Sequence, residues 1–166
     1  MIGSEASFDT YQLLLPTADI FYNHFLYPTV THGGCGECLL TAAADIIGPV
    51  PNSTAVSVVP SEAFDEIVRR VGIACDKVDA GIGILILADV HGSSPFRACL
   101  AMVDGTRPVE IVAGVNLPML IKLATCDRSG LRPAEVAERV KEVGKRSIRL
   151  GSELTGKFAI PREDHH

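Results

Sequence analysis

The stretch GILILA, from Gly83 to Ala88, is a continuous apolar run of six residues. Such runs are typical of strands that are buried on both faces of a parallel sheet. Segments rich in β-branched and apolar residues predict three further strands, at 25–31, 54–59 and 109–113. Because helical patterns alternate with these strands, we expect an α/β fold with three layers, α/β/α. The sheet is expected to be doubly wound and mostly parallel, with strand order 2-1-3-4.

Five helices are expected around these strands, and three of them carry a polar residue that can cap the first turn. Ser61, Ser94 and Asn116 each stand where a side-chain oxygen can accept a hydrogen bond from a free backbone amide. Gly48-Pro49 is a usual stop signal and ends the first helix. The expected helices cover 38–47, 61–77, a segment that starts at 94, 116–123, and 133 to about 150.

Two parts of the chain fit this scheme less well. Pro28 lies inside the first predicted strand, although proline provides no N–H for the ladder of a central strand. Residues 1–22 are interpreted as an N-terminal extension, and residues 23–166 as a single domain. Lys157–Ile160 is the candidate for a last short strand.

The composition is that of an ordinary globular domain. The chain has 166 residues, a formal net charge of −5 and a hydrophobic fraction of 47%. No uninterrupted apolar window reaches the roughly 18 residues of a membrane span, and no signal-peptide pattern opens the chain. We therefore expect a cytoplasmic protein. The acidic charge without a basic stripe argues against a nucleic-acid partner.

The candidate site follows from where the strands end. Open parallel sheets bind ligands at the carboxyl ends of their strands, at the point where the strand order reverses. The first predicted strand leads into Thr31-His32-Gly33-Gly34, and the third leads into the segment 89–95. The order 2-1-3-4 makes these two strands neighbours, so His32 and Asp89 are expected to face each other.

This pair of side chains has a chemical use. A neutral imidazole is a nucleophile when one ring nitrogen carries no proton, and a carboxylate bonded to the other nitrogen fixes that tautomer. The amides and hydroxyls of Gly92, Ser93 and Ser94 can hold a phosphate where the next helix begins. The combination predicts phosphoryl transfer to His32 without a metal or other cofactor. A plainer interpretation stays open, in which His32 is a solvated loop residue, Asp89 a turn residue and Ser94 only a cap.

Three segments carry a resemblance to a known family: THG at 31–33, ADVHGSSPF at 88–96 and VAGVNLPML at 112–120. They resemble the mannose/fructose-type enzyme IIA component of the bacterial phosphoenolpyruvate-dependent sugar phosphotransferase system. The resemblance covers roughly residues 25–125, in the same order and at the same spacing. It implies an α/β fold and a homodimer, with residues 155–161 as the candidate for a strand exchanged between subunits.

The resemblance also implies partners and residue roles. Phosphate would come from a histidine phosphocarrier protein and pass to an enzyme IIB component for sugar uptake, with the membrane involved only through transporter subunits. His32 matches the phosphorylated histidine, Asp89 matches the aspartate that orients it, and Ser94 lies in the phosphate-holding turn. The loop that lines the site matches Asn116, Leu117, Pro118 and Met119.

The chain departs from the family pattern at several places. About two dozen extra residues precede the first strand, and Pro28 interrupts a segment that is normally smooth and apolar. Ser93 stands where a second glycine is common, and Arg97 stands where asparagine is common. Arg97 would add positive potential near a phosphate or recognise a different partner.

Two alternative functions remain on the sequence alone. In the first, phosphorylation of His32 regulates a partner in an incomplete phosphotransferase system. In the second, Cys35-Gly-Glu-Cys38 at a helix start is a redox pair, or joins His32 as a set of three metal ligands. A bound metal would occupy His32 and prevent its phosphorylation. The odd count of five cysteines suggests reduced thiols, and a packing role for the pair is also open.

Overall fold

The sheet forms the centre of the computed structural model, which describes residues 27–50, 53–79 and 81–153. Its four strands are all parallel and follow the order β2-β1-β3-β4, as predicted. The strands are β1 (Tyr27–His32), β2 (Ser53–Val58), β3 (Ile84–Ala88) and β4 (Val109–Ala113).

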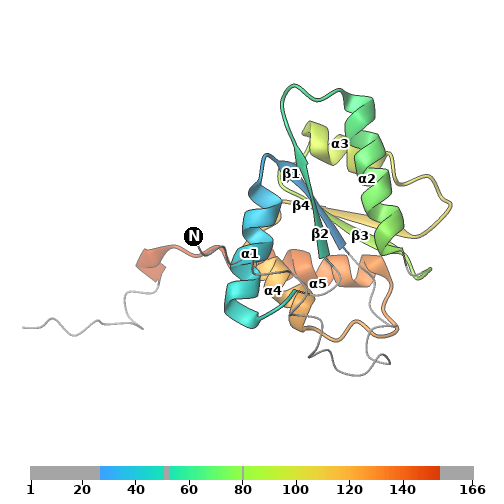
Figure 1. Cartoon of the computed structure of the whole chain (residues 1–166). Helices are drawn as coiled ribbons and strands as arrows, with labels where there is room; N and C mark the ends of the chain where they lie inside the picture. The colour runs from blue at the N-terminus through green and yellow to red at the C-terminus, as the bar shows by residue number, and fades with distance from the viewer. Residues whose placement is uncertain (1–26, 51–52, 80, 154–166) are drawn as a thin grey trace, which may run out of the picture.

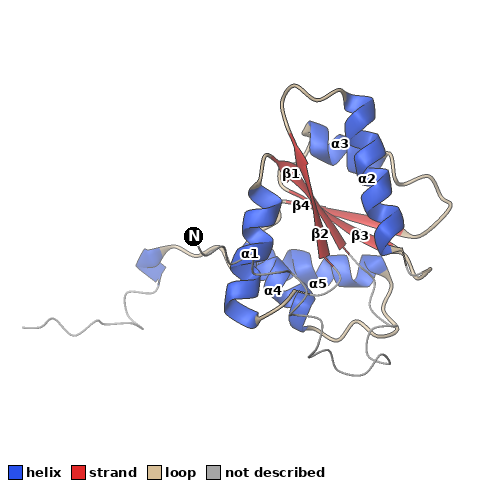
Figure 2. Ribbon diagram, in the orientation of Figure 1, coloured by secondary structure: helices blue, strands red, loops and turns tan. Residues whose placement is uncertain are grey.

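Helices cover both faces of the sheet, which confirms the three-layer α/β/α architecture (Figure 1; Figure 2). Helices α2 (Phe64–Val78) and α3 (Ser94–Leu100) lie on one face. Helices α1 (Cys35–Ile47), α4 (Leu117–Thr125) and α5 (Pro133–Arg146) lie on the other. A short 3-10 helix, η3, follows at Gly151–Glu153.

The apolar run of β3 explains why one strand can serve two cores. Ile84, Ile86 and Ala88 pack into the cluster under α2 and α3, whereas Leu85 and Leu87 pack into the cluster under α1, α4 and α5. All five side chains are fully buried. Successive strand residues point to opposite faces, so a strand covered by helices on both sides must be apolar at every position.

Pro28 lies inside β1, a central strand, and the pairing around it shows how the sheet accommodates it. Residues Tyr27–His32 pair with β2 over their whole length. Pairing with β3 joins Thr29 to Leu87 and Val30 to Ala88, so it begins directly after the proline. Proline lacks the N–H that a longer ladder on this side would use.

Several predicted helix boundaries are wrong. Helix α1 begins at Cys35 rather than at residue 38, because the Thr31 hydroxyl accepts the Gly36 N–H at 2.8 Å and satisfies an amide of its first turn. The cap of α2 is Ala63, without a side-chain hydrogen bond, and not Ser61. Helix α3 is capped by Ser93 rather than by Ser94.

The other end of the chain shows a confirmed cap and a helix shorter than expected. Asn116 caps α4, and its side-chain oxygen accepts the Met119 N–H at 3.3 Å. Helix α5 ends at Arg146, four residues before the expected end near 150. Beyond that point there is little core to bury against, since Ile148 is 76% exposed. The predictions for residues 1–22, 155–161 and 157–160 lie outside the described residues.

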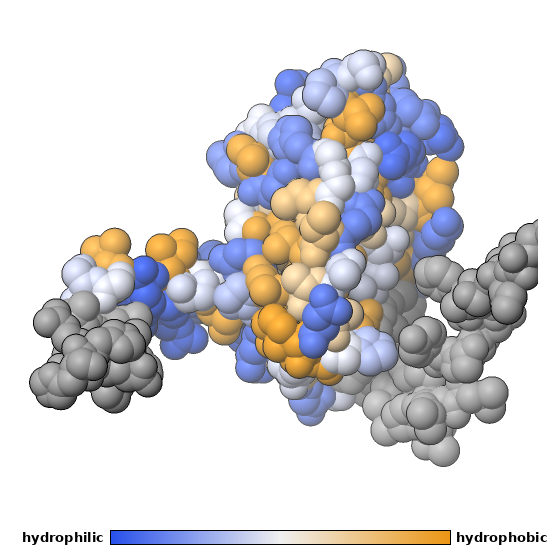
Figure 3. Space-filling view, turned by 60° about the vertical axis from the view of Figure 1, so that its left-hand side comes forward, coloured by the Kyte–Doolittle hydropathy of each residue, from blue (hydrophilic) through white to orange (hydrophobic). Residues whose placement is uncertain are grey.

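Helix α1 is apolar along most of its length but buries only Gly36 and Ala43 fully. Ile46, near its C-terminal end, is 60% exposed. Figure 3 turns this side of the molecule forward and shows apolar residues gathered on its lower half. Among the described helices, none is long and apolar enough to cross a membrane.

Candidate functional site

His32 and Asp89 meet at the carboxyl ends of β1 and β3, as the strand order predicts. The Nδ1 atom of His32 lies 2.8 Å from Oδ2 of Asp89. The same carboxylate oxygen accepts the backbone N–H of His32 at 2.7 Å. One oxygen thus holds both the ring and the main chain of His32, which fixes the direction of the imidazole.

The loop that carries His32 is tied to both neighbouring strands. Gly33 donates its backbone N–H to Val58, the last residue of β2, at 2.8 Å. This glycine has φ +50°, in the left-handed region that residues with a Cβ adopt rarely. Thr31, fully buried, accepts the Gly36 N–H, so the loop is bonded before, at and after His32.

Two opposing effects act on the pKa of Asp89, and their balance favours the carboxylate. Burial acts to raise the pKa of Asp89 and is the largest single effect. Hydrogen bonds from the His32 backbone and ring and from the Val90 N–H outweigh it, so the pKa lies below the usual value of an aspartate. An ionised carboxylate can only accept a hydrogen bond, so Nδ1 of His32 is the donor in this contact. In the neutral ring the free lone pair is then on Nε2.

The exposure of the two side chains differs in a way that suits such a pair. The Asp89 side chain is 14% exposed, whereas that of His32 is 50% exposed. The aspartate is therefore sheltered beneath the histidine, and the ring is accessible from solvent. An incoming macromolecule can reach the imidazole without first displacing the carboxylate.

The turn Gly92-Ser93-Ser94 begins three residues after Asp89, and part of its hydrogen-bonding capacity is already used. The Ser93 hydroxyl donates to the Val90 carbonyl at 2.7 Å and accepts the Phe96 N–H at 3.5 Å. Pro95 has no N–H to offer. The Ser93 N–H is also used, since it donates to the Val90 carbonyl at 3.3 Å. The N–H groups of Gly92 and Ser94 and the Ser94 hydroxyl are then the donors of this turn that can hold an anion, and the phosphate-binding role of the turn remains a prediction.

The four residues predicted to line the site, 116–119, open helix α4 and turn partly toward α5. The Asn116 amide nitrogen donates to the Gly144 carbonyl at 3.4 Å. Met119 is 2% exposed, and its sulfur faces Gly144, where a Cβ would come within 2.7 Å of it. Leu117 is partly buried against the same core. No hydrogen bond joins residues 116–119 to His32 in the described part of the chain, so their lining role remains a prediction.

Sequence reasoning missed the backbone bonds that fix the loop before α4. Gly114 donates its N–H to the Asp89 carbonyl at 2.9 Å, and Val115 donates to the Ala88 carbonyl at 3.0 Å. These bonds attach the end of β4 to the segment that supplies the aspartate. The positive φ of Gly114, +83°, allows the turn, but a lone glycine after a strand gives no sign of its partner.

Cys35 and Cys38 occupy the first turn of α1 and are exposed free thiols. Across the described residues, no group of three or more His, Cys, Asp or Glu side chains is arranged to hold a metal ion. His32, Cys35 and Cys38 thus do not form a ready-made set of three ligands in the described structure, and the metal-site alternative finds no support there.

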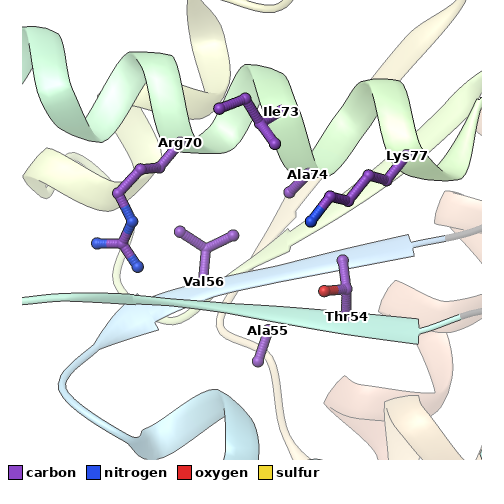
Figure 4. A pocket seen from close by; sticks show the side chains of 7 residues that line it. All are labelled: Thr54, Ala55, Val56, Arg70, Ile73, Ala74 and Lys77. Atoms are coloured by element: carbon purple, nitrogen blue, oxygen red, sulfur yellow. The ribbon is translucent and has the colours of Figure 1, made fainter.

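A separate hollow of about 190 Å³ lies between β2 and α2 (Figure 4). The side chains of Arg70 and Lys77 reach into it from the helix, and Val56 points toward it from the strand. Arg70 is engaged by the Ser57 carbonyl and the Glu62 carboxylate. Neither His32 nor Asp89 lines this hollow, so it does not belong to their site.

Comparison with known proteins identifies the family. Residues 29–141 match the family model described as the fructose IIA component of the PTS, the sugar phosphotransferase system. The chain belongs to this enzyme IIA family. Membership confirms the resemblance seen in the sequence and supports a role in the sugar phosphotransferase relay in general terms.

Individual relatives of this enzyme IIA chain agree. The mannose-specific EIIAB component of Escherichia coli K12 is 35% identical over 92 residues, which are 55% of this chain and 28% of that relative. The chain therefore spans only a part of that longer protein. The fructose-specific EIIA component of Bacillus subtilis is 23% identical over 133 residues, 80% of this chain and 90% of its own length.

Solved structures show the same fold. The mannose/sorbose-specific IIA subunit from Enterococcus faecalis superimposes with a TM-score of 0.69 at 22% identity, covering 83% of this chain and 97% of that one. The EIIA component from Streptococcus agalactiae gives a TM-score of 0.70 at 17% identity, covering 77% and 98%. This enzyme IIA chain thus shares its α/β architecture with both solved chains over nearly the whole of their length.

Proposed function

We propose that this enzyme IIA chain is a phosphoryl relay that accepts phosphate on Nε2 of His32 from a phosphohistidine of a phosphocarrier protein. The observation that carries the proposal is the 2.8 Å contact between His32 Nδ1 and Asp89 Oδ2. With Asp89 as a carboxylate, this contact supports the tautomer that has its proton on Nδ1, in which the Nε2 lone pair is the nucleophile. The half-exposed ring supports transfer from another protein rather than from a buried small molecule.

In the transfer step, Nε2 of His32 approaches phosphorus in line with the donor nitrogen. The bond from the donor nitrogen to phosphorus breaks as the Nε2–P bond forms, and its electron pair returns to the donor ring. Positive charge develops on the His32 ring, and the Asp89 carboxylate stabilises it across Nδ1–H. The transition state is loose, so positioning and nearby dipoles supply most of the rate enhancement. No proton has to leave Nδ1.

The amides around Ser94 support the proposal as a seat for the phosphoryl oxygens. Backbone N–H groups at the start of a helix favour negative charge. Because Ser93 already accepts the Phe96 N–H, the seat is narrower than the sequence suggests. No metal ion enters the step, because the donor phosphohistidine is already activated.

The test is incubation of the full chain with phosphoenolpyruvate, enzyme I and the histidine phosphocarrier. We expect acid-labile, alkali-stable phosphate on His32. His32→Ala should abolish the label. His91→Ala is a matched control, because His91 is exposed in the neighbouring loop and packs at a tilt against the Phe96 ring. Label that persists in His32→Ala would disprove the proposal.

The second half of the relay is transfer to an enzyme IIB component for sugar uptake, and it has its own experiment. Phosphorylated protein, freed of the carrier, should lose its label to IIB in a single-turnover reaction. Normal labelling of His32 without transfer to any IIB would favour a regulatory role for the same phosphorylation.

We further propose that two copies associate as a homodimer. The support from this chain is the apolar surface of α1, which ends at the exposed Ile46. Exposed apolar patches mark association surfaces more often than isolated residues do. Sedimentation analysis should give the mass of a dimer, and Ile46→Glu should shift the equilibrium toward monomer. A monomer at all concentrations would contradict the proposal.

A further inference from the structure

The five cysteines fall into three groups by their burial. Cys75 on α2 and Cys99 on α3 are fully buried, and burial raises the pKa of Cys75 to about 11 and that of Cys99 to about 12. Cys126, at the end of α4, is partly buried. Cys35 and Cys38 are exposed. Oxidation requires an accessible thiolate, so thiol chemistry is directed to Cys35 and Cys38.

These two thiols stand at positions one and four of α1. Residues three apart on a helix lie on the same face, with Cβ atoms roughly 5–6 Å apart. A disulfide needs a Cβ separation of about 3.5–4.5 Å, so closure requires the first turn to tighten by about 1–2 Å. Open space surrounds the preceding Gly33 and Gly34, since a Cβ on either would meet nothing within 4 Å, so the start of this turn has room to move.

The same turn is bonded to the strand that ends at His32. Gly36, which lies between the two cysteines, donates its N–H to the Thr31 hydroxyl at 2.8 Å. The Cys38 N–H donates to the Gly34 carbonyl at 3.1 Å. Two hydrogen bonds therefore connect the first turn of α1 to Thr31 and Gly34, which lie before and after His32.

We propose that Cys35 and Cys38 close into a reversible disulfide that shifts the first turn of α1 and thereby slows phosphoryl transfer at His32. The slowing rests on the proposed function of His32, whereas the disulfide and its effect on the His32 ring do not. The oxidant is a small-molecule disulfide of the glutathione class.

The reaction balances in two exchange steps. The thiolate of one cysteine attacks a sulfur of the small disulfide, which forms a mixed disulfide and releases one small thiolate. The thiolate of the other cysteine then attacks the protein sulfur of the mixed disulfide and releases the second small thiolate. Two protein thiols lose two protons and two electrons, and the small disulfide is reduced to two thiols. A dithiol such as dithiothreitol reverses the reaction.

The structural arm of the test uses the full chain in buffers of oxidised and reduced glutathione. A protease that cleaves after glutamate cuts at Glu37, between the two cysteines. After denaturing digestion of the oxidised protein, the fragments on either side of this cut should stay joined until dithiothreitol is added. Cys35→Ser and Cys38→Ser should each abolish the joined species, and Cys126→Ser should leave it unchanged. Separate fragments, or two stable glutathione adducts, would overturn the disulfide.

The functional arm compares the oxidised and reduced protein at His32. Displacement of a reacting group by about 1 Å costs up to a hundredfold in rate, so we expect oxidation to slow labelling on the order of tenfold. Dithiothreitol should restore the rate, and Cys35→Ser/Cys38→Ser should be insensitive to the oxidant. Nuclear magnetic resonance signals of the His32 ring should move on oxidation without any phosphate donor.

Unchanged ring signals in the joined, oxidised protein would overturn the coupling between the disulfide and His32, as would an unchanged labelling rate. A different result identifies a failure of the proposed function. If the reduced protein takes no label although oxidation joins the fragments and moves the ring signals, phosphorylation of His32 is wrong while the effect of the thiol pair on this residue stands.

Discussion

His32, the last residue of β1, lies beside Asp89, the first residue after β3, but the loops that follow the two strands are held in different ways. The loop after β3 is bonded to Gly114 at its first residue and is held further along by its own Ser93, whose hydroxyl bonds to both Val90 and Phe96 and caps α3. The loop after β1 has no such cap, because Gly34 stands at the start of α1 without a side-chain hydrogen bond. It is held by the Thr31–Gly36 bond across its ends and by bonds to β2 and to Asp89.

The loop after β3 therefore depends more on its own side-chain bonds, whereas the loop after β1 depends more on bonds to other elements. His32 is positioned by Asp89 from β3, and the adjoining Gly33 is bonded to the end of β2. We therefore expect a substitution of Asp89 to disturb both loops, and a substitution of Ser93 to disturb only the loop after β3. His32, the acceptor that we propose, can thus be perturbed from several elements.

Asp89→Asn should have the largest effect on this arrangement. If the amide oxygen replaces Oδ2, the nitrogen faces the Val90 N–H and two donors oppose each other. If the amide is flipped, two donors oppose each other at the His32 N–H. Either way the charge that stabilises the His32 ring is lost, and we expect labelling to slow on the order of a hundredfold. The free energy of unfolding should fall by about 1 kcal/mol.

Rapid-quench labelling and urea unfolding measure these two quantities for Asp89→Asn. Asp104→Asn provides the control, because Asp104 bonds only within its own turn, to Thr106. A labelling rate within about threefold of the unsubstituted protein would show that Asp89 does not stabilise charge on the ring, since tenfold corresponds to only ~1.4 kcal/mol.

Gly36→Ala should break the attachment of α1 to the end of β1. A Cβ at this position would lie 3.1 Å from the Thr31 hydroxyl oxygen and 3.3 Å from the Thr29 carbonyl oxygen. Crowding of this kind costs about 1–3 kcal/mol, which exceeds the roughly 0.5–1 kcal/mol that alanine gains over glycine within a helix. We expect a net loss of about 1 kcal/mol in the free energy of unfolding and slower labelling of His32.

Gly72→Ala is the matched control for that substitution. Gly72 also lies in a helix, but the nearest atom to its Cβ position is the Met102 sulfur at an ordinary 3.9 Å. Its replacement should stabilise the protein by about 0.5–1 kcal/mol. Urea unfolding of both variants checks the pair, and the same sign for both would mean that the Thr31 contact does not constrain the first turn of α1.

The two loops also show what a sequence can and cannot predict. The fold could be predicted because the alternation of strands with helical segments allows few arrangements. The strand order then places His32 beside Asp89. The choice of Ser93 over Ser94 as the cap was not accessible, since both precede Pro95 and only the backbone conformation distinguishes them. The Thr31–Gly36 bond depends on how closely α1 approaches β1, which no local pattern encodes.

Ser93→Ala tests the self-contained loop and should have a smaller and more local effect. Loss of a capping hydroxyl costs about 1 kcal/mol, so the free energy of unfolding should fall by that amount. Because Asp89 precedes this turn and keeps its bonds to His32, labelling should slow far less than in Asp89→Asn. Ser94→Ala, at the first helical position, should change stability by less than about 0.5 kcal/mol.

Urea unfolding together with rapid-quench labelling checks the two serine variants. An effect of Ser93→Ala on the labelling rate as large as that of Asp89→Asn would mean that the β3 loop is not rigid independently of its cap. A loss of rate in Ser94→Ala alone, at unchanged stability, would instead identify its hydroxyl as a contact to phosphate.

The pH dependence of stability should show the smallest effect. The pKa of Asp89 is lower in the folded protein than in an unfolded chain, where it is near 3.9. Between these two values the unfolded state binds more protons, so this carboxylate contributes stability above its unfolded pKa and loses it as the pH falls through the folded pKa. Asp89→Asn should therefore lose less stability than the unsubstituted protein between about pH 5 and pH 2. Urea unfolding across that range measures the difference, and parallel curves would mean that the bonds to His32 and Val90 do not favour the ionised form.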